Sequence, residues 1–427
     1  MNASNESPTI CTRRDCLSLG AGMLLSGLPF GLGWPLGRGD LGQALWASEP
    51  KETKSVAAVI TVYFPNSHAD VILTKILQGW NHDGGPGPAL KLTSIYIDQP
   101  EGSAFGLEIL DKHGIPRFDT IEEAVTVGGS TIPVDGVISI GEHGNYPVNE
   151  LGQQLYPRKR FFEEITDTFQ KHGRVVPVFN DKHISTRWSE AAWMVERARE
   201  MKVPFMAGSS LPVSYRTPEI EIPWGCQLDA AVGIGYSGLD IYGFHTLECY
   251  QTLVERRNQA ETGVKWVRCL EGSELWSVVD DGWVDREALQ AVLDVVPRSI
   301  PNIRDAPGVV LFQFEYVDGF RGAVFMVPSA QRIGVGVKIR GQSAKGTTFE
   351  ERSEPRYPHF AFLLKAIERM VHTGVSPYPV ERTLLTGGVL DRALTSKSKD
   401  GGLLRTPELQ IPYTPVDYPY APKEPAN

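Results

Sequence analysis

The feature that most constrains the fold is a repeated alternation of apolar runs and amphipathic stretches between residues 56 and 207. Strand-like and helix-like segments that alternate in this way predict a parallel sheet with helices on its faces. Folds of this type bind nucleotides outside the carboxyl ends of their strands. We expect strands at 56–61, 91–97, 134–140, 175–180 and 203–207, and helices at about 68–79, 101–113, 157–172 and 187–201.

The loop after the first of these strands lacks the glycines that such a fold normally carries there. Residues 62–68 read VYFPNSH, which is aromatic and polar. Glycines at this point let the backbone approach a pyrophosphate at the N-terminus of the next helix. The sequence therefore predicts a nucleotide-type fold whose cofactor is held by other groups, with Asn66, Ser67 and His68 as candidates, or is not held at all.

Length, charge and hydropathy limit the partners of the chain. Its 427 residues can form two domains with full cores. The net charge of −9 at pH 7 gives no basic surface of the kind that binds nucleic acid. Beyond the first fifty residues no apolar stretch is long enough to span a bilayer, so we expect no stable membrane anchor in the mature protein.

Residues 1–47 resemble an export signal of the twin-arginine (Tat) type. Arg13 and Arg14 precede an apolar stretch at 17–34, and Ala47 ends a segment that resembles a cleavage site. The alternative is a coincidental arginine pair ahead of a buried helix, which the many glycines between 20 and 33 disfavour. We therefore expect a periplasmic or secreted protein. Tat export carries folded proteins, often with a cofactor already bound, which fits a nucleotide enzyme.

The mature chain divides into three predicted segments, at 48–210, 211–404 and 405–427. The first is the Rossmann-type domain, and the last is a proline-rich extended tail. The middle one is an α+β domain with an open, mainly antiparallel sheet, whose free face is the expected surface for a homo-oligomer. Its β-type runs lie at 264–270, 309–317, 322–328 and 333–340, and its closing helices at about 358–373 and 380–396.

A GxGxxG pattern does occur, at 233–238 in the middle segment. A β-type run precedes it and a helical pattern follows it, which is the local context of a dinucleotide loop. It lies outside the parallel series, however, and the next acid at a strand end, Glu271, is further away than the roughly 20 residues typical of such loops. We favour a role other than cofactor binding.

The residues that can carry chemistry follow two of the predicted elements. Lys182 follows strand 175–180, where an ammonium can make a substrate hydroxyl easier to deprotonate. The helical pattern after the GxGxxG segment carries His245, a candidate proton acceptor, with Glu248 on the same face and Asp240 near its start. The alternatives are a surface turn for Lys182 and a core histidine bonded to a carbonyl for His245.

Other polar residues face the same crevice. Asp98 follows the second strand, where an acid can accept hydrogen bonds from a ribose, and the alternative is a turn aspartate. Glu142 and His143 follow strand 134–140 and can line a polyol pocket with Ser67 and His68. A less favoured alternative is a divalent ion held by His68, His143, His183 and Glu142. Cys226, Cys249 and Cys269 allow at most one disulfide.

These segments resemble the glucose–fructose oxidoreductase / inositol dehydrogenase family (Gfo/Idh/MocA) over about residues 56–405. Residues 173–183, GRVVPVFNDKH, are similar to the strand end that supplies the catalytic lysine of the family, and Lys182 takes that place. Residues 238–248, GLDIYGFHTLE, are similar to the helix that carries its catalytic pair, here Asp240 and His245. The resemblance implies a carbohydrate or polyol substrate and NAD or NADP as cofactor.

The sequence departs from the family at three points. The first loop has no GxGxxG, Asp240 and His245 are one residue further apart than usual, and Asp181 and His183 replace the usual neighbours of the lysine. These changes leave the expected fold intact and affect the expected binding of NAD or NADP.

The function expected from this resemblance is hydride transfer between a sugar, polyol or glycoside and a nicotinamide that lies over Ser67 and Asp98. His245 would take the hydroxyl proton, Lys182 would stabilise the charge that develops on the oxygen, and Asp240 would orient His245 or the sugar. Two alternatives remain. One is a redox-neutral enzyme that processes glycosides with a bound cofactor, and the other is a sugar-binding protein that has lost the cofactor.

Overall fold

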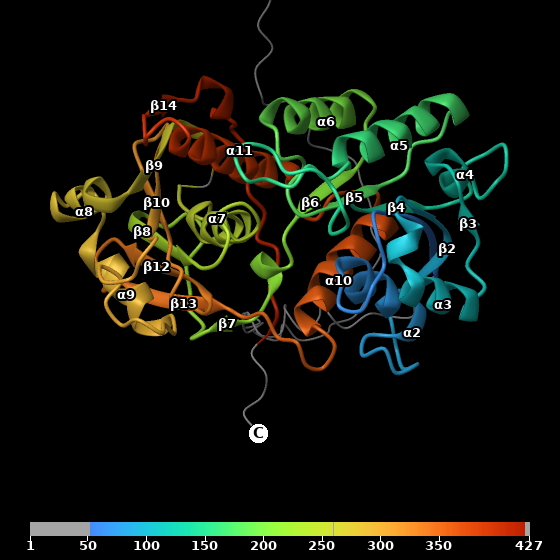
Figure 1. Ribbon diagram of the computed structural model, residues 1–427, viewed down its shortest axis with the longest axis horizontal. Coiled ribbons are helices and arrows are strands. Elements are labelled where there is room, and N and C mark those ends of the chain that lie inside the picture. Colours follow the sequence, from blue (N-terminus) through green and yellow to red (C-terminus); the bar gives the residue numbers. More distant parts are fainter. Residues whose placement is uncertain (1–51, 259, 423–427) are drawn as a thin grey trace, which may run out of the picture.

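The structure is a computed structural model that describes residues 52–258 and 260–422, and the predicted signal peptide at 1–47 lies outside them. Two sheets lie side by side, each with its own helices (Figure 1). The first sheet has six parallel strands in the order β3-β2-β1-β4-β5-β6. They are β1 (Lys54–Ile60), β2 (Leu90–Ile97), β3 (Arg117–Phe118), β4 (Gly136–Ile140), β5 (Val178–Asp181) and β6 (Phe205–Gly208).

The order of this sheet reverses between β1 and β4, and ligands bind at such a switch point in open α/β sheets. Both strands are almost entirely buried because helices cover the two faces of the sheet. The predicted Rossmann-type domain is confirmed, whereas β3 and α4 had no counterpart in the sequence prediction. The helices are the π-helical turn η1 (Asp70–Thr74), α2 (Lys75–Gln78), α3 (Ala104–Lys112), α4 (Ile121–Thr126), α5 (Arg158–His172) and α6 (Trp188–Glu200).

The second sheet has eight strands in the order β14-β9-β10-β11-β8-β12-β13-β7. Neighbouring strands are antiparallel except β11 and β8, which confirms the predicted, mainly antiparallel sheet. The strands are β7 (Arg216–Thr217), β8 (Leu228–Gly235), β9 (Val264–Glu271), β10 (Val310–Tyr316), β11 (Arg321–Met326), β12 (Ile333–Ile339), β13 (Lys345–Phe349) and β14 (Leu404–Arg405).

Helices cover both faces of this second sheet. One face packs against α7 (Ile241–Val254) and α11 (Val380–Lys397), the other against α8 (Gly272–Asp280) and α9 (Arg286–Val295). Helix α9 lies so close to β12 that a Cβ on Gly336 would collide with the carbonyl of Ala288. The face that we expected to be free for a homo-oligomer is thus covered by α9 over β12 and β13. Association of copies stays a prediction.

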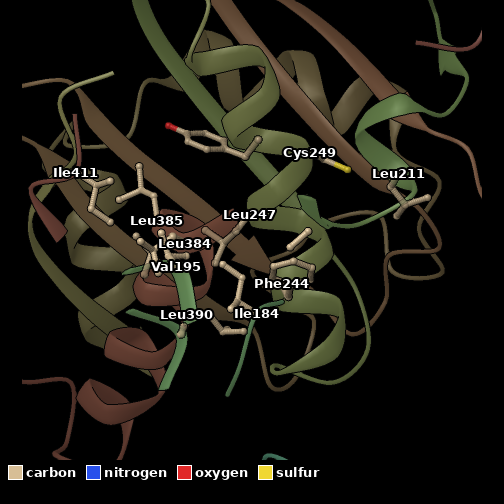
Figure 2. Packing of buried hydrophobic residues seen from close by; sticks show 14 of the residues in the cluster. Ile184, Val195, Leu211, Phe244, Leu247, Cys249, Leu384, Leu385, Leu390 and Ile411 are labelled. Carbon is tan, nitrogen blue, oxygen red and sulfur yellow. The ribbon is translucent and has the colours of Figure 1, made fainter. Parts of the chain in front are cut away.

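One buried cluster joins the two domains around α7 and α11 (Figure 2). Ile184 and Val195 enter it from the first domain, Phe244 and Leu247 from α7, and Leu385 from α11. Helix α7 is buried on nearly all sides, which is typical of a core helix. Each fully buried side chain of this size contributes about 1.5–3 kcal/mol to the stability of the fold. The combined packing of these side chains therefore holds α7 in place between the two sheets.

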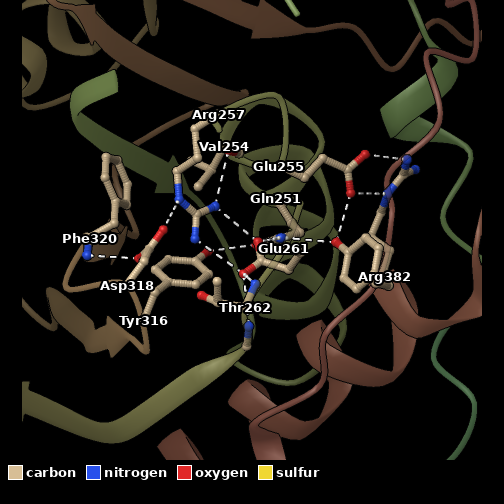
Figure 3. Close-up of polar contacts among 12 residues, drawn as sticks. Gln251, Val254, Glu255, Arg257, Glu261, Thr262, Tyr316, Asp318, Phe320 and Arg382 are labelled. Atoms are coloured by element: carbon tan, nitrogen blue, oxygen red, sulfur yellow. Dashed lines mark hydrogen bonds and ion pairs between the residues drawn. The ribbon is translucent and has the colours of Figure 1, made fainter. Parts of the chain in front are cut away.

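The carboxyl-terminal segments return to the body of the protein. Helix α10 (Pro358–Thr373) packs on the first domain, and the described part of the tail crosses the second domain, where Leu409 is buried. A buried polar network holds this crossing (Figure 3). In it, the Glu255 carboxylate accepts hydrogen bonds from the guanidinium of Arg382, at 2.9 and 2.5 Å, and from the hydroxyl of Tyr413, at 2.8 Å.

Two further observations concern the cysteines and the length of the apolar helices. Cys226, Cys249 and Cys269 are free thiols. Across residues 52–258 and 260–422, no helix is both long and apolar enough to cross a membrane.

Candidate active site

Lys182 stands at the carboxyl end of β5, at the edge of the sheet where ligands bind in this architecture. Its backbone has a φ of 63°, an uncommon value for a residue with a side chain. The turn is held by the backbone hydrogen bond from Lys182 N to Gly208 O (3.2 Å) and by Asn180, whose side-chain amide donates to the carbonyls of Asp181 and His183. The lysine side chain is buried and enters the boundary between the two domains.

Lys182 and His245 are in contact although 63 positions separate them in the sequence. Nζ of Lys182 lies 3.0 Å from Nε2 of His245, and Nδ1 of the same ring lies 2.6 Å from Oγ of Ser209. An ammonium can only donate, so Nε2 is the acceptor and Nδ1–H donates to Ser209. Burial, and then the charge of Lys182, lower the pKa of His245 well below its usual value. The imidazole is therefore neutral near pH 7 and has a defined tautomer.

A buried ion-pair group formed by Glu142 and Arg158 also holds Lys182 in place. The carboxylate of Glu142 lies 3.4 Å from Nζ of Lys182 and 2.7 Å from a guanidinium nitrogen of Arg158. Burial opposes ionisation of Glu142, yet the charges of Lys182 and Arg158 together hold its pKa well below the usual range. The opposite side of the guanidinium lies 3.2 Å from Nε2 of His183, whose own pKa is lowered by burial and by Arg158.

Asp240 is close to this group but does not bond to His245. It is the N-cap residue of α7, and its Oδ1 accepts a hydrogen bond from Nε2 of Gln153 at 3.0 Å. Burial raises the pKa of the Asp240 carboxyl. The residue that orients His245 is Ser209, whose backbone N–H in turn donates to Glu248 at 3.3 Å. The sequence prediction had given Asp240 the role of orienting either His245 or the sugar.

Ser209, Arg158 and Gln153 were missed by the sequence prediction. Ser209 directly follows β6, so its place at the carboxyl end of a parallel strand was a usable signal. Arg158 begins α5 and Gln153 lies in the preceding loop, and neither position has a sequence pattern that marks it.

The loop after β1 is closed by its own side chains. The hydroxyl of Ser67 accepts hydrogen bonds from the backbone N–H groups of Phe64 and Asp70, each at 3.3 Å. The Asp70 carboxylate accepts from the backbone N–H of Asn66 at 2.8 Å and from the Thr74 hydroxyl at 2.7 Å. A buried carboxylate therefore occupies the helix start at which a Rossmann-type fold presents free N–H groups to a pyrophosphate.

The other residues predicted to bind the cofactor are also engaged. His68 donates through Nδ1 to Asp181 at 2.6 Å, and its ring packs edge-on against His143, with the ring centroids 5.5 Å apart. The Asp98 carboxylate accepts from the hydroxyls of Tyr96 (2.6 Å) and Tyr146 (2.7 Å) and pairs with Arg160 at 2.5 Å. Burial opposes the ionisation of Asp98, but these partners hold its pKa below the usual value.

The alternative metal site finds no support in the geometry. No group of three or more His, Cys, Asp or Glu side chains within the described ranges is arranged to hold an ion. His68 pairs with Asp181 and Glu142 with Arg158, while the fully buried His183 contacts Arg158. Three of the four proposed ligands therefore bond to other partners, and the fourth, His143, packs its ring against that of His68.

The residues at the switch point do not fit a nicotinamide dinucleotide in the usual pose of this fold. Asp70 would repel the pyrophosphate, and the oxygens of Asp98 that would accept the ribose hydroxyls already bond to two tyrosines and Arg160. Tyr63 fills the space beside these groups, because a Cβ on Gly106 would collide with its ring.

The GxGxxG pattern has a packing role. Gly233 and Gly235 lie inside β8, outside the parallel sheet, which supports the sequence-based choice against a dinucleotide loop. A Cβ on Gly235 would lie 2.9 Å from Sδ of Met326 and 3.0 Å from Cβ of Thr246, and would overlap the Thr246 hydroxyl. A Cβ on Gly238 would meet nothing within 4 Å. The glycine at 235 thus lets α7, with His245, lie close to the sheet.

A hollow of about 330 Å³ lies elsewhere, between the end of α6 and the α10–α11 turn. Arg199, Lys202, Val375 and Glu381 are among its lining residues, and it adjoins the amino end of β6. Perturbed titratable groups gather instead around Lys182, at the opposite ends of the strands, and such groups are characteristic of active sites. We therefore place the candidate active site at Lys182 and His245.

Comparison with known proteins identifies the fold. No family model matches the sequence, and no curated protein sequence matches it significantly. Among solved structures, the chain is similar to GenD2 from gentamicin A biosynthesis in complex with NAD, with 11% identity and a TM-score of 0.53 over 84% of this chain and 99% of GenD2.

It is also similar to apo scyllo-inositol dehydrogenase from Lactobacillus casei, with 9% identity and a TM-score of 0.51 over 83% of this chain and 99% of the dehydrogenase. A super-repressor mutant of Gal80p from Saccharomyces cerevisiae has 8% identity and a TM-score of 0.51, over 84% and 99% of the two chains. At these identities the similarity shows the fold alone, and it is the fold that the resemblance to inositol dehydrogenases implied.

Proposed function

We propose that this protein is an enzyme that activates a hydroxyl group of a sugar, polyol or glycoside by general-base catalysis for a redox-neutral group transfer. The observation that carries the proposal is the buried contact of 3.0 Å between Lys182 and His245. A protonated amine and a neutral imidazole that meet at one point are complementary to a single hydroxyl, which can donate to one and accept from the other.

The substrate hydroxyl would lie between the two groups and replace their direct contact. Its proton would pass to Nε2 of His245 as the oxygen forms a bond to an electrophilic centre of the substrate, and the Lys182 ammonium would stabilise the negative charge that develops on the oxygen. The proton on Nε2 would then pass to the group that leaves that centre. Ser209 keeps the lone pair of the ring on Nε2 by accepting from Nδ1–H. Glu142 fixes the position of the ammonium at 3.4 Å, and burial excludes competing water.

A second candidate is oxidation of the same hydroxyl with NAD or NADP. The fold shared with GenD2, whose structure contains NAD, favours it, as do Lys182 and His245 at the positions of the family's catalytic residues. The carboxylates of Asp70 and Asp98 disfavour it, which is why we place the redox-neutral reaction first.

The first test is the cofactor content of protein that has been exported with its own leader. We expect denaturation to release no nicotinamide, measured by absorbance and by native mass spectrometry. A stoichiometric dinucleotide in the released fraction would reverse the order of the two candidates.

The second test is turnover, followed by proton NMR on methyl glucosides, disaccharides and inositols without added cofactor. Lys182→Met and His245→Asn should each lower the rate by about 10²–10⁴-fold, the usual contribution of one acid–base group. Lys202→Met, at an exposed turn, is the matched control and should have no effect. Near-normal kcat in Lys182→Met would refute the assignment, and saccharide binding without any turnover by the wild type would favour a binding protein.

Periplasmic or secreted location is also part of the proposal, and it rests on Arg13 and Arg14. Replacing both with lysine should leave the precursor in the cytoplasm, as seen by fractionation and immunoblotting. Unchanged export of this variant would contradict a twin-arginine signal.

A further inference from the structure

The second domain presents two aromatic rings and a carboxylate toward Lys182 and His245. Tyr236 directly follows β8, Tyr242 lies in the first turn of α7, and Glu351 follows β13. The two tyrosine rings are tilted by 42° with their centroids 4.6 Å apart, and Tyr242 lies 6.1 Å from the ring of His245. The Tyr236 hydroxyl donates to Glu351 at 2.8 Å. A continuous set of contacts thus runs from Glu351 to the proposed reacting pair.

The charge of Lys182 reaches Glu351 across the domain boundary. Burial raises the pKa of the Glu351 carboxyl, while the hydrogen bond from Tyr236 and then the ammonium of Lys182 lower it. Yet the Glu351 side chain is accessible to solvent, and both tyrosines are only partly buried. Glu351 and the two rings are therefore reachable from solvent, and Tyr242 connects them to the ring of His245.

The preceding residue, Glu350, has a structural role in the same segment. Glu350 is buried, accepts from the guanidinium of Arg352 at 2.7 Å, and bonds to the hydroxyl of Thr217. These contacts fix the chain after β13 and direct Glu351 toward Tyr236. The backbone there does not depend on Glu351, so its carboxylate is available for a ligand.

We propose that Tyr236, Tyr242 and Glu351 form the binding subsite for the ring of an uncharged saccharide or cyclitol. The inference rests on the proposed function and names the part of the substrate that does not react. Aromatic faces pack well against apolar C–H surfaces, and a carboxylate accepts hydrogen bonds from hydroxyl groups. The same carboxylate disfavours a substrate with its own negative charge, such as a uronate or a sugar phosphate.

The test is binding of four probes to the full mature protein, measured by saturation-transfer NMR and calorimetry. The probes are methyl β-D-glucoside, myo-inositol, D-glucuronate and glucose 6-phosphate. For the wild type we expect the two neutral probes to bind about tenfold or more tightly than the two anions. If neither neutral probe binds at about 10 mM, or if the anions bind as tightly, the proposal is wrong.

Three variants locate the subsite. Tyr242→Ala should weaken binding of the neutral probes about tenfold, since a large aromatic contact is lost, and Tyr242→Phe should retain most of it. Glu351→Gln should reduce the discrimination against D-glucuronate by about tenfold. Glu354→Gln, an exposed glutamate in the same segment, is the control and should behave like the wild type. Circular dichroism establishes that each variant is folded.

Lys182→Met separates this proposal from the proposed function. If it abolishes turnover and retains binding of the neutral probes, both proposals hold. If the wild type binds these probes through Tyr242 and Glu351 but converts nothing, the subsite stands and the catalytic assignment fails. If Tyr242→Ala and Glu351→Gln bind all four probes like the wild type, the subsite is refuted whatever the turnover.

Discussion

Replacement of Gly235 by alanine tests how α7 is positioned. The added Cβ would lie 2.9 Å from Sδ of Met326 and 3.0 Å from Cβ of Thr246, where ordinary carbon contacts are about 3.5–4.0 Å. Helix α7 is packed on nearly all sides, so it can yield only by moving as a unit. Overpacking of this kind costs about 1–3 kcal/mol. Replacing a strand glycine by alanine stabilises the fold by about 0.5–1 kcal/mol, because alanine has less conformational freedom to lose. We therefore expect the free energy of unfolding to fall by a net amount of about 1–2 kcal/mol.

The assay is equilibrium unfolding in urea, together with the turnover measured by NMR. A shift of α7 moves His245 relative to Lys182, and a misplacement of about 1 Å can cost about 10²-fold in rate. Gly238→Ala, in the same motif but in open space, should change stability by less than about 0.5 kcal/mol.

The double variant Gly235→Ala with Thr246→Ala identifies the collision. Removing the Thr246 hydroxyl frees the space that the new Cβ needs, and should recover at least about 1 kcal/mol relative to Gly235→Ala alone. The reasoning fails if Gly235→Ala is as stable as the wild type, or if the second substitution only adds a further loss.

Two further predictions concern the network of Figure 3 and the response to acid. Arg382→Met leaves the Glu255 carboxylate buried without its ion partner and should lower the free energy of unfolding in urea by about 3–5 kcal/mol. The double variant Arg382→Met with Glu255→Gln should lose clearly less than the sum of the two single changes. Additive losses would contradict the pairing. His359 is buried, and burial lowers its pKa to about 3. Below pH 6.5 the histidine is therefore protonated in the unfolded chain but stays neutral in the folded protein. Stability should therefore fall as the pH decreases from 6.5 toward 3, and His359→Gln should reduce that slope by about 1.4 kcal/mol per pH unit; an unchanged slope would show that His359 does not titrate in this way.

The parallel sheet was predictable because its strands are buried on both faces and read as continuous apolar runs. Five of its six strands correspond to such runs, whereas β3 has only two residues and no apolar signature. Helices α8 and α9 were missed because the sequence there was interpreted only through its β-type runs. Missing α9 matters because this helix covers a face of the second sheet that the prediction had left free.

The sequence by itself determined five of the six strands of the parallel sheet, the place of Lys182 after one of them and the absence of glycines from the first loop, because these follow from local composition and periodicity. Only the tertiary structure decided that Lys182 meets His245, that Ser209 rather than Asp240 holds the imidazole, and that Asp70 closes the helix start. Contacts between residues far apart in the chain depend on how α7 packs between the two sheets. That packing comes from the whole core, and no single segment encodes it.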